Sequence, residues 1–259
     1  MVPARIAMDE WVKDDVVQVW KSGNTKIEFQ AFLIEPPDLA VVKPPHLPLA
    51  VCFPGLGSRY PVFADDIRRV APEHFVLVVA IRPKGGWWFI DDGSQYGWIT
   101  GDVQDNLVRL YGEWIGSLAV RSGIDRDRVG IFGHSAGGYA VLELLTVTNM
   151  RFSGVGVSGA HGHGQWDCTD IPLELRDEAK LKFHLFFNRL SLHAGAGFIH
   201  VTHCPQDRLC KWEDADMIMK ALSHGQKLRG LRGIITRPLC SAEELDTVPR
   251  SEEHTSELQ

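Results

Sequence analysis

Short, nearly continuous apolar runs recur along the chain of 259 residues. They occupy residues 47–53, 75–81, 128–133, 153–159 and 197–203, and each is bounded by glycine, proline or polar residues. Runs of this length and uniformity are typical of parallel strands that are buried on both faces of a sheet. The pattern therefore predicts a buried parallel sheet as the centre of the fold.

Helical patterns lie between these runs, at residues 63–70, 103–120, 138–147 and 214–222. In the longest of them, Val103, Leu107 and Leu110 recur at spacings of three and four, which places them on one helix face. Strands that alternate with helices form βαβ units, and right-handed crossovers between them produce a doubly wound sheet. The predicted fold class is α/β, with a mostly parallel, doubly wound sheet.

The first part of the chain has a different pattern. Residues 16–20 and 26–35 read as strands, and the second of them alternates apolar with polar positions, as a half-exposed strand does. A proline-rich stretch at 36–48 then interrupts the pattern. We expect these two strands to form an antiparallel edge of the sheet.

Two later segments complete the expected organisation. Residues 160–196 exceed what a minimal crossover needs, so we expect a helix there together with a pocket-lining excursion or a small cap. Residues 228–238 are the natural candidate for the last strand. No stretch reads as a linker, so we expect residues 1–249 to form a single domain.

The last ten residues, Arg250–Gln259, read RSEEHTSELQ. This peptide resembles the translation of a widely used sequencing adapter in one frame. We treat 250–259 as an adapter-derived artefact tail and exclude it from the analysis of the fold. On this interpretation the natural C-terminus is missing.

Composition narrows the classes of function. A formal net charge of −6 without a long basic run argues against nucleic acid as a partner. No stretch reaches the roughly 18 to 20 apolar residues of a membrane span, and the N-terminus lacks a signal-peptide layout. Five scattered cysteines, an odd number, favour reduced thiols over a disulfide framework. We expect a cytoplasmic protein, and composition does not predict its oligomeric state.

The segment Gly133–Gly137 reads GHSAG and fits the pattern G-x-S-x-G. It follows a buried-type strand and precedes the helical pattern at 138–147, which is the context of a nucleophile elbow. A serine at such a tip adopts a strained backbone, so the residues two before and two after it must be small. The helix N-terminus also favours a negative charge beside the serine. Ser135 is therefore the candidate nucleophile; the alternative is a plain glycine-rich turn between a strand and a helix.

Acyl transfer also needs a second donor for the oxyanion, usually a backbone amide after an earlier central strand. The segment FPGLGS, residues 53–58, occupies that place. It resembles the H-G-x-G loop of α/β-hydrolase esterases, with Pro54 where that family usually has histidine. The resemblance implies that the amides of Leu56 and Ala136 hold the oxyanion. An ordinary glycine turn is the alternative.

The α/β-hydrolase resemblance also implies a catalytic acid, because triad residues follow in the order serine, acid, histidine. The stretch HCPQD, residues 203–207, resembles the family's H-G-x-x-D segment after a strand. Asp207 then matches the acid, whose role would be to orient the imidazole and stabilise its protonated form. A solvated loop aspartate is the competing interpretation.

The expected histidine does not follow, because residues 225–249 contain none, and His254 belongs to the tail. Several explanations are open. The catalytic histidine was lost with the natural C-terminus, or it was replaced where the sequence next to the adapter-derived tail is altered, or His224 serves in its place. A histidine after residues 153–159, His161 or His163, is a further alternative, as is a protein that never was an enzyme.

Two loops are candidates for lining the substrate pocket. Trp87 and Trp88 resemble the aromatic loop of carboxylesterases and acyl-protein thioesterases, and at least one of them could instead pack in the core. His161 follows another strand. A zinc site from His161, His163 and Cys168 matches no strong metal spacing, so we expect no metal and no other cofactor.

From about residue 47 to residue 212 the chain resembles phospholipase/carboxylesterase and polyhydroxyalkanoate-depolymerase-like esterases. That resemblance implies a serine hydrolase that cleaves a small or lipid-like carboxylic ester or thioester through an acyl-enzyme on Ser135. The alternatives are a non-catalytic binding protein with the same fold, since fold does not dictate function, and an acyltransferase that uses the same serine.

Overall fold

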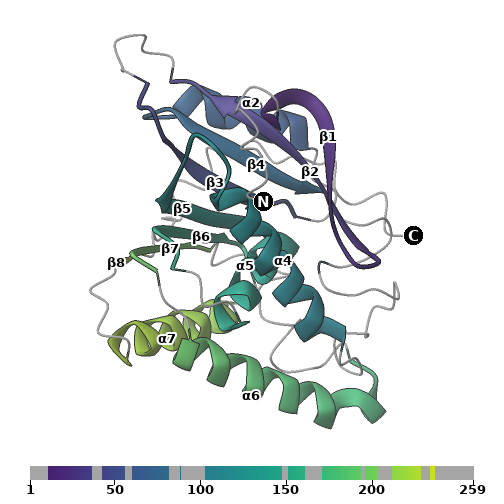
Figure 1. Ribbon diagram of the computed structural model, residues 1–259. Helices are drawn as coiled ribbons and strands as arrows, with labels where there is room; N and C mark the ends of the chain where they lie inside the picture. The colour runs from purple at the N-terminus through teal and green to yellow at the C-terminus, as the bar shows by residue number, and fades with distance from the viewer. Residues whose placement is uncertain are drawn as a thin grey trace, which may run out of the picture.

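The structure is a computed structural model, and it describes residues 11–36, 43–55, 60–81, 88, 103–147, 151–160, 171–193, 196–203, 212–228 and 234–236. In these segments eight strands form one sheet in the order β1-β2-β4-β3-β5-β6-β7-β8. The strands are β1 (Lys13–Ser22), β2 (Thr25–Ile34), β3 (Leu47–Phe53), β4 (Phe75–Ile81), β5 (Ile124–His134), β6 (Gly154–Ser158), β7 (Phe198–Thr202) and β8 (Ile234–Thr236). Figure 1 shows the twisted sheet and the helices packed against it.

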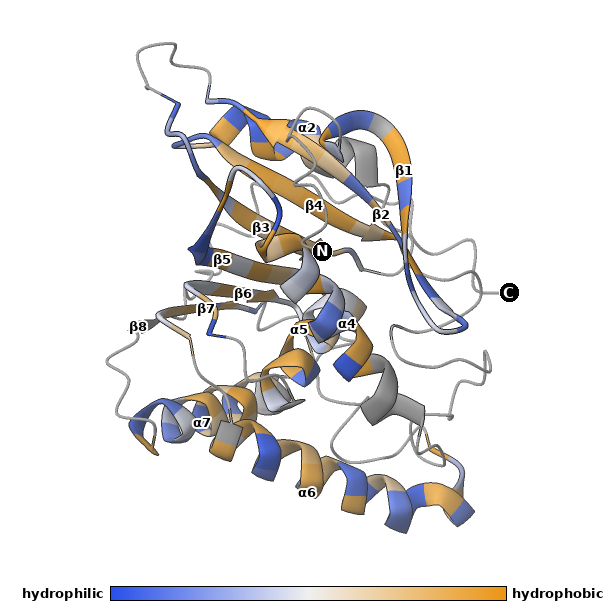
Figure 2. Cartoon of the chain, in the orientation of Figure 1, coloured by the Kyte–Doolittle hydropathy of each residue, from blue (hydrophilic) through white to orange (hydrophobic). Residues whose placement is uncertain are grey.

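The predicted fold class is confirmed. Strands β1 and β2 pair antiparallel with one another, β2 pairs antiparallel with β4, and all remaining pairs are parallel. The antiparallel strands therefore lie at one edge, as the alternating pattern predicts. Figure 2 shows the central strands as mostly hydrophobic, whereas the β1–β2 hairpin carries several hydrophilic positions.

Five α-helices connect the strands in the described part of the chain. They are α2 (Tyr60–Val70), α4 (Val103–Ala119), α5 (Ala136–Val147), α6 (Arg176–His193) and α7 (Trp212–Leu228), and a short 3₁₀ turn (Leu173–Leu175) precedes α6. Helix α6 packs against α5 and α7 as the crossover between β6 and β7. Residues 161–170, where the sequence predicts the pocket-lining excursion, lie outside the described residues. None of the described helices is both long and apolar enough to cross a membrane.

The core has two parts because neighbouring residues of a strand point to opposite faces of the sheet. Val51 and Phe53 of β3 belong to the larger cluster, which includes the buried faces of α4, α5, α6 and α7. Cys52, between them, belongs to a smaller cluster with Ala64 of α2. Burial raises the pKa of the Cys52 thiol, which therefore stays neutral in the core.

The order of the strands determines where a site can form. The chain passes from β3 outward to β4 and then returns past β3 to β5, so α2 and α4 lie on opposite faces of the sheet. Strands β3 and β5 are neighbours and pair as far as Phe53 with Gly133. In open α/β sheets the crevice at the carboxyl ends of two such strands is the usual ligand site.

Helix α5 carries a buried carboxylate, Glu143, which is 0% exposed. Its Oε1 accepts a hydrogen bond from the Tyr139 hydroxyl at 2.8 Å, and its Oε2 lies 3.9 Å from Nη2 of Arg189 on α6. A buried charge is tolerated only when it is hydrogen-bonded and paired. Glu143 therefore connects α5 to α6 as well as occupying space between them.

We expect Glu143→Leu to lower the free energy of unfolding by about 1 to 3 kcal/mol, because the hydrogen bond from the Tyr139 hydroxyl and the ion pair with Arg189 are both removed. The exposed Glu113 of α4 is a matched control, since Glu113→Leu should change stability by about 0.5 kcal/mol or less. Urea denaturation followed by circular dichroism measures both. Equal effects of the two substitutions would contradict the connecting role of Glu143.

Candidate active site

Ser135 lies at the turn between β5 and α5, at the carboxyl edge of the sheet. Its φ is 52°, and it is the one non-glycine residue with a positive φ in the described part of the chain. Such a conformation costs an L-residue about 1 to 2 kcal/mol, so the surroundings must impose it. The strained strand-to-helix turn that the sequence predicts is therefore what the structure shows.

The glycines around Ser135 are required by the close approach of backbones. A Cβ on Gly133 would lie 2.2 Å from the Gly137 carbonyl oxygen, and a Cβ on Gly137 would lie 1.7 Å from the Phe53 carbonyl oxygen. Both separations are far below van der Waals contact, and the obstructing atoms are backbone atoms that cannot rotate away. Only glycine at both positions allows β3, β5 and α5 to meet at this point.

Two backbone hydrogen bonds hold the turn itself. The Ser135 amide donates to the Ser158 carbonyl at the end of β6 at 2.8 Å, and the Tyr139 amide donates to the Ser135 carbonyl at 3.1 Å. The Ser135 amide is thus used in the scaffold. The amide of Ala136 belongs to the first turn of α5, whose N–H groups have no acceptor within the helix. The role of Ala136 as an oxyanion donor stays a prediction.

The chain after β3 reaches Ser135 from the neighbouring strand. An added Cβ on Gly55 would lie 3.2 Å from Ser135 Cβ and 3.1 Å from the His134 carbonyl oxygen. The Gly55 backbone therefore lies directly against the elbow. Leu56, the predicted second oxyanion donor, is outside the described residues, but the residue before it is in place beside the serine.

The His134 side chain is exposed and lies beside the end of β6. Its Nδ1 is 3.4 Å from the Ser158 hydroxyl oxygen, a separation near the upper limit for a hydrogen bond. The sequence offers no signal for this contact, because it joins residues that become neighbours only when β5 and β6 pair.

Trp88 is only 1% exposed and packs with Phe53 and Tyr111, at ring-centroid distances of 5.1 and 6.0 Å. Of the two environments considered for it, the pocket and the core, the structure places it in the core. Burial also raises the pKa of the Tyr111 phenol, so this aromatic cluster is uncharged. Trp87, His161 and Asp207 lie outside the described residues, and their roles stay predictions.

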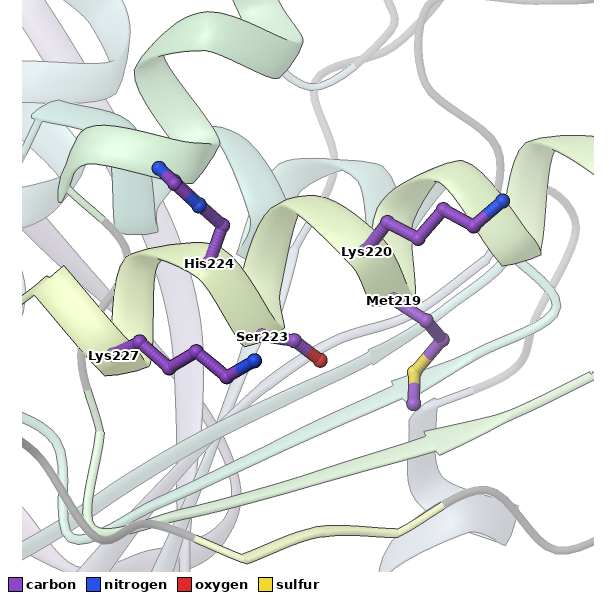
Figure 3. Close-up of a pocket in the computed structure, with 5 residues that line it drawn as sticks. All are labelled: Met219, Lys220, Ser223, His224 and Lys227. Atoms are coloured by element: carbon purple, nitrogen blue, oxygen red, sulfur yellow. The ribbon is translucent and has the colours of Figure 1, made fainter.

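His224 is not placed to act as the catalytic base, which corrects that alternative. It is exposed near the C-terminal end of α7 (Figure 3). Two residues later, Gln226 Nε2 donates to the Ala196 carbonyl at 2.9 Å, and Ala196 precedes the first residue of β7. This end of α7 therefore lies at the amino edge of the parallel strands.

Ser135 follows the carboxyl end of β5, and β5, β6 and β7 run parallel. A strand of five residues spans about 16 Å, so His224 and Ser135 are separated by several times a hydrogen-bond length. A groove of about 330 Å³ beside α7 is lined by His224 with Met219, Lys220, Ser223 and Lys227 (Figure 3). It lies on this α7 surface and not at the elbow.

Another histidine, His203, lies at the carboxyl edge of the sheet, the same edge as Ser135. His203 directly follows β7 and is 3% exposed. Register links His134 to Ser158 and Ser158 to Thr202, so the residues that follow these three strands, Ser135 and His203 among them, share one edge of the sheet.

Among the described residues, no group of three His, Cys, Asp or Glu side chains could hold a metal ion. His163 and Cys168, considered as zinc ligands, lie outside them.

Solved structures with this arrangement of elements include hydrolases. A thermostable esterase superimposes with a TM-score of 0.56 at 16% identity, over 92% of this chain and 58% of its own. The uncomplexed acylaminoacyl peptidase of Pyrococcus horikoshii gives 0.59 at 18%, over 90% and 38%. An acetyl xylan esterase from Paenibacillus sp. R4 gives 0.57 at 13%, over 88% and 82%.

This chain therefore has the α/β-hydrolase fold, and it spans little more than half of the thermostable esterase. No protein-family model matches it, and no curated protein matches it in sequence. At these identities the likeness concerns the fold alone.

The strain at Ser135 predicts an unusual order of stabilities. Ser135→Gly should be more stable than Ser135→Ala by about 1 kcal/mol, because only glycine adopts a φ of 52° without a steric cost. Ser158, in strand β6, is the control: there glycine should be less stable than alanine, since it has no strain to relieve. Urea midpoints of the four variants test this, and alanine more stable than glycine at both positions would show that Ser135 is unstrained.

Proposed function

We propose that this protein is a serine hydrolase that cleaves carboxylic esters or thioesters through an acyl-enzyme on Ser135. The observation that carries the proposal is the left-handed backbone of Ser135 at the N-terminus of α5, with the Gly55 backbone lying against its side chain. A turn of this kind projects a hydroxyl from the carboxyl edge of a sheet. The esterases and peptidases that share the fold support a hydrolytic reaction.

The reaction follows from these positions. Ser135 Oγ attacks the acyl carbon, and the carbonyl oxygen becomes an oxyanion next to the N-terminus of α5, where the helix dipole and the Ala136 amide stabilise negative charge. The Leu56 amide, next to Gly55, supplies the second donor. The tetrahedral intermediate then collapses: the C–O or C–S bond to the leaving group breaks, and the alcohol or thiol departs with the proton that Ser135 gave up. Water next attacks the acyl-enzyme ester, which releases the free acid and restores the Ser135 hydroxyl.

The seryl proton requires an acceptor. We propose that Asp207 orients a histidine, and residues 225–249, where the α/β-hydrolase resemblance implies that histidine, contain none. Without the base, only the oxyanion site and substrate binding remain, which in other serine hydrolases give a residual acceleration of about 10³ to 10⁴. The 259-residue chain should therefore turn over slowly and still depend on Ser135.

The test is hydrolysis of p-nitrophenyl acetate by the chain and by Ser135→Ala. We expect a low Ser135-dependent rate that free imidazole in the buffer increases, because imidazole can accept the proton that the absent base would accept. Imidazole also attacks the ester directly, so the Ser135→Ala rate at each concentration is subtracted. Equal rates for both proteins at every imidazole concentration would refute Ser135 as the nucleophile.

The same assay separates the alternatives. A non-catalytic binding protein gives no difference between the chain and Ser135→Ala. An acyltransferase gives an ester product when an alcohol is added, which product analysis by mass spectrometry distinguishes from the free acid. A hydrolase continues to release mainly acid.

A further inference from the structure

Trp88 lies within the sequence segment that follows β4, yet it contacts the end of β3. Its ring packs at close to a right angle against Phe53, the last residue of β3, with an interplanar angle of 80°. It also packs edge-on against Tyr111 of α4. The side chain is therefore held on several sides, and its position is determined by the aromatic cluster.

The polar atom of Trp88 has one specific partner. Nε1–H donates a hydrogen bond to the Pro54 carbonyl oxygen at 3.1 Å, and both residues are buried. In this environment water does not compete for the carbonyl, so the bond is stronger than the same bond at the surface. The indole thus constrains the direction of a carbonyl 34 positions earlier in the sequence.

That carbonyl belongs to the peptide unit that reaches the elbow. A trans peptide is planar, and its C=O and N–H point in opposite directions. When Trp88 holds the Pro54 oxygen, it therefore also sets the direction of the Gly55 N–H. On the other side, an added Cβ on Gly137 would lie only 2.8 Å from the Pro54 oxygen, so the oxygen is confined between the indole and α5.

We propose that Trp88 is a positioning residue: its indole N–H holds the Pro54–Gly55 peptide, from which the chain continues to Leu56, and so restricts where the Leu56 amide can lie relative to the oxyanion formed at Ser135. The inference rests on the proposed hydrolase function for its catalytic consequence, but the orientation of the peptide is a property that is measured separately. Trp88 would not touch the substrate. It connects the segment after β4 to the loop after β3.

The chain offers a matched control for this role. Trp114 of α4 is also fully buried and packs in the same aromatic cluster, against Phe53 at 6.4 Å. Its Nε1 has no hydrogen-bond acceptor among the described residues. Trp88→Phe and Trp114→Phe therefore remove similar apolar volume, but only the first removes a hydrogen bond.

A third variant separates the N–H from the packing. The five-membered ring of histidine places Nε2 where the indole has Nε1, so Trp88→His keeps a donor and loses the six-membered part of the ring. It should be less stable than Trp88→Phe because it buries less apolar surface. A merely structural role for Trp88 predicts that activity follows stability in these variants.

We expect the activity of the variants not to follow their stability: Trp88→His should be more active than Trp88→Phe although it is less stable. Rates are measured at pH 8 with p-nitrophenyl acetate and imidazole, after subtraction of the Ser135→Ala rate. Trp88→Phe should lower kcat about tenfold or more with little change in KM, because a misplaced oxyanion donor affects the transition state and not binding. Trp114→Phe should leave both constants within about twofold, and Trp88→His should retain most of kcat. Equal kcat losses in Trp88→Phe and Trp114→Phe would overturn the proposal.

The peptide can also be observed directly, because Pro54–Gly55 is the only Pro–Gly pair in the sequence. Labelling with carbonyl-¹³C proline and ¹⁵N glycine gives a single HNCO correlation from this peptide. It should move in Trp88→Phe and stay close to its original position in Trp114→Phe and Trp88→His. If the chain shows no Ser135-dependent turnover, the proposed function fails, and this correlation alone decides: an unmoved peak in Trp88→Phe would refute the positioning role.

Discussion

Everything at the candidate site depends on a steric constraint, the close approach of three backbones at the carboxyl ends of β3 and β5. The Phe53 carbonyl lies so near Gly137 that no Cβ could fit there, and the Gly137 carbonyl likewise leaves no room for a Cβ on Gly133. This approach forces the residue between them into the left-handed conformation with a φ of 52°. The conformation carries a free-energy cost that packing of the core must offset. The same contacts bring Ser135, the N-terminus of α5 and Gly55 close together.

The topology explains why this approach happens at the ends of β3 and β5. Strand order reverses at β3 and β5, so the helices that follow them, α2 and α5, leave to opposite faces of the sheet. In open α/β sheets such a reversal is the usual place for a ligand site. The aromatic cluster of Phe53, Trp88, Tyr111 and Trp114 includes the last residue of β3 and two residues of α4. It is uncharged and tightly packed, which provides a rigid base for the strained turn. Glu143 continues this support by connecting α5 to α6 through a buried, hydrogen-bonded carboxylate.

The features that the proposed chemistry uses differ in how far apart in the sequence their parts lie. The elbow is local, because a strand, a glycine-flanked serine and a helix follow one another within Ile124–Val147. The oxyanion loop is non-local, because it reaches Ser135 only through the pairing of β3 with β5. The base in the proposed chemistry is a histidine, and residues 225–249 contain none. The position of His224 at the amino edge of the strands follows from the direction of α7, which returns along the sheet after β7.

The sequence by itself determined the elements and the elbow. Continuous apolar runs placed β3 at residues 47–53 and β4 at 75–81, as observed, because burial on both faces leaves no room for polar positions. The spacing of Gly133, Ser135 and Gly137 specified the strained turn for a similarly local reason. Only the tertiary structure decided that Trp88 packs in the core and that His224 lies far from Ser135. Such placements depend on which strands become neighbours and on where a returning helix ends, and no local pattern of residues encodes either.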